Sequence, residues 1–451
     1  MMALLDRALM VLAAALLAMT GLAAWLDVSQ AWDVWYYHLP FAARLVGIVG
    51  GDSFVFSRLN QGRFEGFPLG GEIAQGLLWR LTGRPEAANL VAFSSIPLFA
   101  WLVRRWFAVP FHHGVLALFA VPLVQTHASA SYVDLPANVS LACLVLLVLR
   151  AFERTDAPSA RDAVVGLALA SGAAHLRFQL APPVLLALVL LATRAARRER
   201  LTLALGAPLV FAWPLKNLLR HGNPAYPVEL RIGPFTMPGL DSPYASAPTW
   251  LENAPRPLRF FASVFEVGLR PLSDAGRWSV DQWTPPDHPG YRMGGFFGAY
   301  VVLLLVLLAW AWRAGKLTKT QRWAFLLLTG VVAFMPQSHE LRYYMVWMLI
   351  LVALALRATP PASRPLVALA CSGFAAVVIA STGGAYVRPS GSSFEELKKK
   401  RVDAALLAPR KEGARLCIAR PPWNVLYAAP LRGDVVRYVV VEADSPDDCP
   451  R

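Results

Sequence analysis

Residues 10–40 read MVLAAALLAMTGLAAWLDVSQAWDVWYYHLP and join a long apolar run to an aromatic cluster around one carboxylate. The run from Met10 to Leu26 contains no charged residue. Since a helix rises about 1.5 Å per residue, about 20 apolar residues span the hydrocarbon layer of a membrane. We therefore predict a retained transmembrane helix over 8–26, with Asp33 a few residues beyond its outer end.

Apolar blocks of similar length recur along the rest of the chain. The sequence is 56% hydrophobic and 16% charged, whereas soluble domains carry about a quarter charged residues. Further helices are predicted over 87–103, 110–126, 135–152, 162–176, 179–193, 201–217, 295–312, 323–336, 341–357 and 365–382. The expected fold is an all-α polytopic membrane protein with about 11 transmembrane helices.

Basic residues gather in every second short connection and set the expected orientation. These connections hold Arg104 and Arg105, Arg150 to Arg161, Arg194 to Arg200, Arg313 to Arg322, and Arg357 with Arg364. The opposite connections hold mainly His127, Asp134, Arg177, His339 and Arg342. Positive loops stay cytoplasmic, so we expect a cytoplasmic N-terminus and a periplasmic C-terminus in a bacterial inner membrane. The net charge of +14 does not indicate a nucleic-acid partner, because it forms no basic stripe with stacking aromatics.

Two external loops interrupt the expected transmembrane domain, residues 1–386. The first loop, residues 27–86, contains helical apolar patterns over 35–49 and 69–81 that predict helices lying in the membrane interface. The second, residues 221–294, is rich in Pro, Trp and Tyr.

The tail, residues 387–451, has a different pattern and predicts a small α/β appendage. Its expected elements are a helix over 394–407 and strands over 415–419 and 435–441. In a periplasmic tail, Cys417 and Cys449 would meet an oxidising environment and could form a disulfide. Two unpaired thiols are the alternative.

Two carboxylates at external helix ends are candidates for chemistry. Asp33 lies among Trp and Tyr residues that would desolvate it, and such a group can act as a general base or anchor a cation. The alternative is a helix-end carboxylate in an aromatic belt. Asp134 precedes Leu135 and Pro136, which is also typical of a simple helix N-cap. Both emerge on the same side of the membrane and could share one cavity.

Arg177 and Arg342 lie at external helix ends, against the trend of the other basic residues. Arginine there suits a bidentate phosphate contact, although a snorkelling interfacial arginine is the alternative. His38, Glu65 and Glu72 complete the polar set of the first loop. A divalent cation is conceivable there, but no ligand spacing supports one, and we expect no cofactor.

Together these features resemble the GT-C superfamily of polyprenyl-phosphate-sugar-dependent glycosyltransferases, in particular its bacterial branch of protein O-mannosyltransferases and lipid A aminoarabinose transferase. The resemblance rests on Asp33 followed by Tyr37-His38-Leu39-Pro40, on the long first loop, on Asp134, on Gly222-Asn223-Pro224, and on Arg342-Tyr343-Tyr344. Many members pair two acidic residues in the first loop, whereas Val34 follows Asp33 here. This departure weakens any inference to protein mannosylation or to a metal-dependent mechanism.

The resemblance implies Asp33 as catalytic base with Asp134 in support. Arg177 and Arg342 suit stabilisation of the departing lipid phosphate. We expect Tyr37, His38, Glu65 and Tyr343 to contact the substrate as well. The implied donor is a sugar on a polyprenyl phosphate, the acceptor is a glycan, lipid or protein, and direct displacement would invert the anomeric centre.

Two other functions remain open. A transporter or flippase would predict charges deep within spans and matching interrupted helices in two halves of the chain. The sequence instead places its polar residues at external helix ends. A catalytically inactive membrane scaffold would share all of these features.

Overall fold

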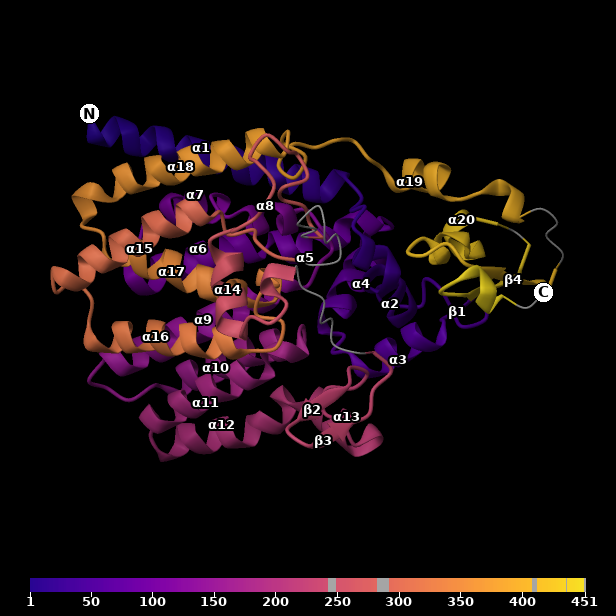
Figure 1. The fold of residues 1–451 in the computed structure, drawn as a ribbon, viewed down its shortest axis with the longest axis horizontal. Helices are drawn as coiled ribbons and strands as arrows, with labels where there is room; N and C mark the ends of the chain where they lie inside the picture. Colours follow the sequence, from indigo (N-terminus) through magenta and orange to yellow (C-terminus); the bar gives the residue numbers. More distant parts are fainter. Residues whose placement is uncertain (242–248, 282–291, 408–411, 435, 450–451) are drawn as a thin grey trace.

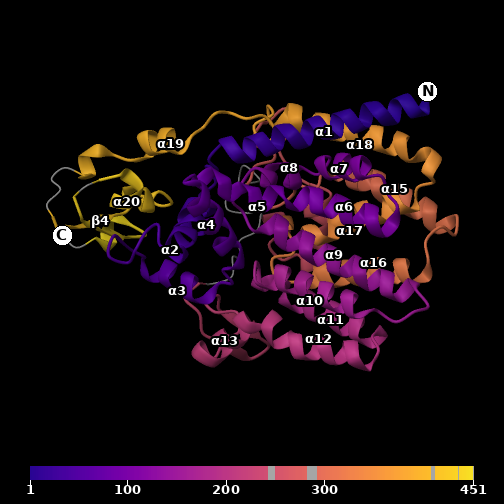
Figure 2. The same ribbon diagram turned by 180° about the vertical axis from the view of Figure 1, so that it is seen from behind.

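The computed structural model describes residues 1–241, 249–281, 292–407, 412–434 and 436–449, and most of them are helical. In Figure 1 the long helices lie roughly side by side, and the N-terminus is at one end of this bundle. The short elements of the first loop and the tail gather at the other end, as the reverse view in Figure 2 also shows.

Each of the predicted apolar blocks is helical. The bundle contains α1 (Met2–Leu26), α5 (Leu90–Phe93), α6 (Ser95–Phe107), α7 (Phe111–Phe119), α8 (Pro122–Ala128), α9 (Asp134–Glu153), α10 (Ala160–Ala174), α11 (Ala181–Arg194), α12 (Arg197–Val210), α13 (Ala212–His221), α15 (Gly298–Arg313), α16 (Lys319–Phe334), α17 (Met345–Ala358) and α18 (Arg364–Ser381). The all-α class of the main body is therefore confirmed.

Among the described residues, five helical segments are long and apolar enough to cross a membrane, or six if the bent pair α12–α13 is one span. They are Met2–Leu26, Pro85–Phe107, Asp134–Glu153, Leu341–Ala358 and Pro361–Ser381. Other blocks are broken or short. Pro122 lacks an N–H and begins a new helix after α7, and α12 and α13 meet at 50°. The count of about 11 spans stays a prediction.

Burial within the bundle fits a lipid surround. All residues of α17 from Met345 to Leu356 are buried, so this helix lies inside the bundle. In contrast, α1 exposes Val11 and Leu22, and α18 exposes Leu366 and Leu369. Exposed apolar rows on long helices are typical of surfaces that face lipid.

The first loop folds into η1 (Val34–His38), α2 (Leu39–Leu45), β1 (Phe54–Val55), α3 (Arg58–Gly66) and α4 (Gly70–Thr82). The helix predicted over 69–81 is confirmed as α4, which exposes Ile73, Leu77 and Leu81 along one side as an interfacial helix would. The interfacial placement of 35–49 stays a prediction. Trp35 and Phe41 in this stretch are buried in protein: Phe394 of the tail stacks on Trp35 at 5.6 Å, and Phe56 and Phe64 of the first loop pack against Phe41.

The tail contains α19 (Phe394–Arg401), β4 (Arg415–Ile418), α20 (Ala429–Arg432) and β5 (Val439–Glu442). These elements confirm the predicted α/β character, and Cys417 and Cys449 form the predicted disulfide. The tail does not stand alone, because β1 of the first loop pairs in parallel with β5 in a sheet of order β1-β5-β4. The first loop and the tail therefore share one core.

The second external loop contains an antiparallel hairpin, β2 (Leu230–Ile232) and β3 (Phe235–Met237), and α14 (Arg256–Val264). The sequence did not predict these elements. Parts of the predicted loop 221–294, namely 242–248 and 282–291, lie outside the described residues.

Glu442 is the polar centre of the junction between the first loop and the tail. It is 6% exposed, and its carboxylate accepts hydrogen bonds from Ser57 N at 3.0 Å, Asn60 Nδ2 at 3.1 Å and Asn424 Nδ2 at 3.3 Å. Replacing Glu442 with alanine would leave these donors without an acceptor, and each buried unsatisfied donor lowers the free energy of unfolding by about 1–3 kcal/mol. We expect Glu442→Ala to release the tail to limited proteolysis and to lower the unfolding temperature.

The matched control for this prediction is Glu395→Ala, since the Glu395 side chain is 69% exposed on α19 of the same tail. It should be digested at the wild-type rate. Equal digestion of the Glu442→Ala and wild-type chains would contradict the assigned role of Glu442.

Candidate active site

The segment that carries Asp33 is fixed at both sides. On the N-terminal side, the Asp27 carboxylate accepts hydrogen bonds from the backbone N–H groups of Ser390, Gly391 and Ser392. On the C-terminal side, Trp35 donates its indole N–H to Ser29 O at 2.7 Å. Asp33 directly precedes the π-helical turn η1, a geometry that is common at functional sites.

Asp33 is buried against two arginines. It is 7% exposed, and its Oδ2 lies 3.0 Å from Arg342 Nη1 and 3.7 Å from Arg292 Nη1. Burial alone would raise the pKa of Asp33, but the charges of Arg342 and Arg292 outweigh it and hold that pKa well below its usual value. The carboxylate is therefore ionised and ion-paired in this state.

Asp134 forms a second buried ion pair close by. Its Oδ2 accepts a hydrogen bond from Arg177 Nη2 at 2.6 Å, and Asp134 is fully buried. The N-cap alternative is wrong, because Asp134 is the first residue of α9 and Val133 occupies the cap position. The Oδ1 atom of Asp134 is buried and has no hydrogen-bond partner among the described residues. It can accept a hydrogen bond from a ligand hydroxyl.

Arg342 joins the parts of the site. Its Nε lies 3.5 Å from Glu340 Oε2, and its Nη2 donates to the Tyr343 hydroxyl at 3.0 Å. The Tyr343 ring lies under both Arg342, at 4.9 Å, and Arg177, at 5.2 Å. We refer to this set as the Asp33 cluster: Asp33, Asp134, Arg177, Arg292, Glu340, Arg342 and Tyr343.

Helix packing brings these distant residues together. Asn138 of α9 donates to Arg342 O at 3.1 Å and accepts from Val346 N at 2.9 Å, which holds the start of α17 against α9. Asp134 and Arg342 therefore lie at the adjacent ends of two packed helices. The cluster forms where α9 and α17 meet the first loop.

A small pocket opens beside Arg177. Its lining comprises Tyr37, His38, Phe67, Pro68, Glu72, Val133, Leu176, Arg177 and Phe178. His38 Nδ1 lies 2.6 Å from Glu72 Oε1, and both residues are buried. The predicted site residues Tyr37 and His38 are thus placed next to the cluster. Glu72 joins them, and a divalent cation there would have His38 and Glu72 as its first two ligands.

Glu65 belongs neither to the Asp33 cluster nor to the lining of this pocket. It is exposed on α3, where its carboxylate accepts a hydrogen bond from Gln61 Nε2 at 2.7 Å and its backbone oxygen accepts one from Lys216. The turn of α3 directs Glu65 away from the face that packs inward through Asn60 and Gly62.

Sequence reasoning missed Arg292 and did not select Tyr132. The Arg342 guanidinium lies 5.5 Å over the Tyr132 ring, and Tyr132 donates its hydroxyl to Asp281 Oδ1 at 2.6 Å. Arg292 is one arginine among several in the second external loop and has no pattern of its own. Tyr132 could have been found from its place two residues before Asp134.

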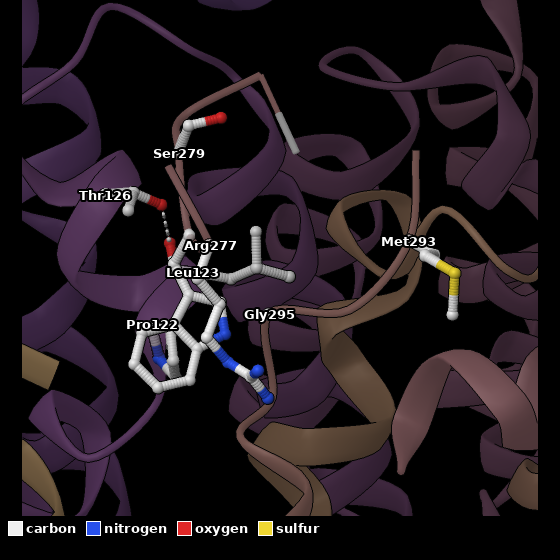
Figure 3. A pocket seen from close by; sticks show the side chains of 8 residues that line it. Pro122, Leu123, Thr126, Arg277, Ser279, Met293 and Gly295 are labelled. Atoms are coloured by element: carbon white, nitrogen blue, oxygen red, sulfur yellow. Dashed lines mark hydrogen bonds between the residues drawn. The ribbon is translucent and has the colours of Figure 1, made fainter. Parts of the chain in front are cut away.

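A second pocket, shown in Figure 3, lies between the start of α8 and the segment around Arg277 and Gly295. Its lining consists of Pro122, Leu123, Thr126, Arg277, Trp278, Ser279, Met293 and Gly295. None of these lining residues carries a carboxylate. Arg277 and Trp278 donate to Glu266, and this carboxylate also accepts the N–H groups of Gly295 and Phe297. Glu266 therefore organises the loop, and the Asp33 cluster is the better candidate site.

Comparisons with known proteins give one structural likeness. No family model matches the chain, and no curated protein matches it. The structure is similar to the crystal structure of ArnT from Cupriavidus metallidurans in the apo state, with 16% sequence identity and a TM-score of 0.40. The match covers 95% of this chain and 89% of that chain. At this low identity and TM-score the functional assignment rests on the Asp33 cluster itself.

Proposed function

We propose that this chain is a membrane glycosyltransferase of the GT-C type. In this proposal it transfers a sugar from a polyprenyl-phosphate donor to a hydroxyl of a glycan, lipid or protein acceptor. The observation that carries the proposal is a buried carboxylate, Asp33, held against Arg342 and Arg292 at the ends of apolar helices. A site of this kind offers a base and phosphate-binding cations at the depth of a lipid head group.

The reaction follows from these two kinds of group. The acceptor oxygen attacks the anomeric carbon, and the bond from that carbon to the phosphate oxygen breaks with its electron pair on the leaving polyprenyl phosphate. Asp33 takes the proton of the acceptor hydroxyl, and the arginines stabilise the charge that develops on the phosphate. Attack opposite the leaving group inverts the anomeric centre.

Donor binding would change the basicity of Asp33. In the structure its pKa is held low by the Arg342 and Arg292 charges, although burial acts in the opposite direction. A donor phosphate competes with Asp33 for these guanidinium groups. As it draws them away, the pKa of Asp33 rises and the carboxylate becomes a stronger base. Asp33 therefore becomes an effective base only when the donor is bound.

Asp134 and the small pocket suit recognition of the sugar or the acceptor. Asp134 Oδ1 is a buried acceptor without a partner among the described residues, and Arg177 fixes the other oxygen. Tyr37 and His38 line the adjacent pocket and offer a ring face and polar atoms. These features fit a hydroxyl-rich ligand.

The proposed location is the bacterial inner membrane, with the N-terminus cytoplasmic and the Asp33 cluster and tail periplasmic. Both α9 and α17 start at the cluster and carry a basic residue in the last turn, Arg150 and Arg357. This polarity supports placing the basic ends in the cytoplasm.

The transporter alternative has one supporting feature, the bent helix pair α12–α13. An inverted-repeat transporter would have a matching interrupted pair in its other half. The described residues contain one such pair, and we therefore prefer the transferase.

Lipid analysis tests the proposed donor. We expect mass spectrometry of the detergent-purified chain to show a polyprenyl-phosphate-linked sugar that is enriched over the whole membrane extract. The Arg357→Ala chain should retain this lipid, because Arg357 lies at the far end of α17 and pairs with Glu153. A lipid composition equal to that of the membrane extract would contradict the proposed donor.

A further inference from the structure

A second cluster of polar side chains lies at the opposite end of the bundle from Asp33. Asp6 belongs to the first turns of α1, and His112 and His113 belong to the first turn of α7. Asp6 Oδ1 lies 3.0 Å from His112 Nε2 and 2.8 Å from His113 Nε2. Figure 1 shows this end of α1 on the far side of the bundle from the tail.

The spacing of these atoms matches a shared metal ion. Ligands bound at about 2.1 Å in tetrahedral or octahedral geometry lie about 3.0 to 3.4 Å apart. In the structure, one ligand atom from each of the three residues lies within 4.8 Å of the other two. Among the described residues this is the one group of three such side chains that close together. The two distances from Asp6 Oδ1, 3.0 and 2.8 Å, lie at the lower end of this range or just below it.

Local structure explains how adjacent histidines reach one point. Pro110 caps α7, so His112 and His113 lie in its first turn, where their rings are 4.3 Å apart. Helix α1 packs against α7 and brings Asp6 over both rings. The His113 side chain is 2% exposed, His112 is 14% exposed and Asp6 is 41% exposed. The group is therefore rigid on one side and open to water on the other, which leaves room for further water ligands.

The surrounding charges allow a cation. The nearby basic side chain on the facing helix is Arg364, whose Nη1 donates to Ala108 O at 2.8 Å. Arg7 follows Asp6 on α1. One carboxylate with two neutral imidazoles carries a single negative charge, and a divalent ion would leave the group with one positive charge. Arg364 and Arg7 oppose binding to some extent, so we expect an affinity below that of a structural zinc site with several thiolates.

We propose that Asp6, His112 and His113 form a divalent transition-metal site that clamps α1 to α7. Two imidazole nitrogens and one carboxylate oxygen suit Zn²⁺, Co²⁺ or Ni²⁺ better than Mg²⁺ or Ca²⁺, which prefer oxygen ligands. The clamp has a consequence for the proposed catalytic end. Helix α1 exposes much of its apolar surface and leads directly into the segment of Asp33. Fixing its start against α7 sets the axial position of this helix.

Metal binding by the full chain tests the site. The protein is purified in detergent through a histidine-free affinity tag, stripped with EDTA and titrated with Zn²⁺ by calorimetry, and Co²⁺ absorption reports the ligand set. We expect one equivalent of Zn²⁺ per chain, a rise in unfolding temperature, and a Co²⁺ spectrum typical of nitrogen and oxygen ligands. Asp6→Asn and His112→Gln should each weaken Zn²⁺ binding at least about 100-fold, since loss of an outer-shell partner alone costs 10- to 100-fold.

The matched control is His221→Gln, which removes a histidine that stacks on Tyr226 far from this group. It should bind Zn²⁺ like the wild type. Of the two variants, His112→Gln is the one least expected to misfold, because the His112 side chain is partly exposed. The purified His112→Gln protein should remain monodisperse. If the wild type takes up no Zn²⁺, or if both variants bind it as the wild type does, the three residues form a hydrogen-bonded group only and the proposal is overturned.

Discussion

An Asp33→Asn chain should fold and bind its donor but lose about 100- to 10,000-fold of its transfer rate, the usual contribution of a positioned general base. Asparagine keeps the size of the side chain and can still accept the hydrogen bond that Arg342 Nη1 makes at 3.0 Å. It cannot take the acceptor proton. The expected signature is a fall in kcat with donor affinity kept or raised, because asparagine carries no charge that competes with the donor phosphate for the arginines. Both quantities are measured with a lipid-linked sugar donor in detergent.

The control for this prediction is Asp52→Asn, since Asp52 is an exposed carboxylate of the same first loop. It should transfer sugar at the wild-type rate. A well-folded Asp33→Asn chain with near-normal turnover would remove Asp33 as the base, and Asp134 or Glu72 would be the next residues to test. An inactive wild-type chain that nevertheless binds the donor would favour the scaffold alternative.

Donor binding and pH should be linked through Asp33. The Arg342 and Arg292 charges outweigh the effect of burial and lower the pKa of Asp33 in the free protein. Ionised Asp33 therefore stabilises the fold above its unfolded pKa, and this stabilisation is lost only as the pH falls through the lowered folded value. We expect activity, but not stability, to fall in mild acid, because the pKa of Asp33 is expected to be higher in the donor-bound state.

The bundle could be predicted from sequence because its signal is local. Each apolar block became a helix, since a run of apolar residues in a lipid surround has to satisfy its own backbone hydrogen bonds. The same signal cannot fix how many helices span the membrane. Blocks such as 110–126 and 201–217 contain breaks, at Pro122 and Phe211, and these follow from packing as well as from the sequence.

The junction of the first loop and the tail could not be predicted, because its signal is not local. Strand β1 contains two residues and pairs with β5 through Phe54 and Val440. A two-residue strand has no alternation to detect. The pattern over 35–49 was assigned to the membrane interface because its packing partner in the tail is also distant in the sequence. An apolar helix face looks alike whether it packs against lipid or against a protein segment that lies more than 300 residues away.

The sequence predicted those site residues that carry a positive charge where the rest of the chain has few. Arg177 and Arg342 stood out because the helix ends expected to be external carry few basic residues, and the structure places both in the Asp33 cluster. Glu65 was selected only for its place in the first loop, and it proved to be exposed. Arg292 contacts Asp33 from a long loop, where one arginine cannot be told from the next without the fold.

Replacing Arg342 with alanine should have the largest effect on both stability and donor binding. The Arg342 side chain is 2% exposed and pairs with Asp33 and Glu340. Its loss removes this partner from both buried carboxylates, and Asp33 keeps Arg292 at 3.7 Å. Removing one partner of a buried ion pair costs about 3–5 kcal/mol. Burial already raises the pKa of Glu340, with Arg342 opposing it, so Glu340 should take up a proton in the variant. A lower unfolding temperature and lost donor binding are expected.

A double variant separates the two effects. Asp33→Asn in the Arg342→Ala background removes one of the two buried carboxylates that have lost Arg342, so stability should recover in part while donor binding stays lost. The two substitutions contact each other and are expected to be non-additive for stability. Arg357→Ala, at the other end of α17, is the matched arginine control and should bind donor normally. If the double variant regained both stability and donor binding, Arg342 would serve only to neutralise Asp33, and the phosphate contact would have to come from Arg292 or Arg177.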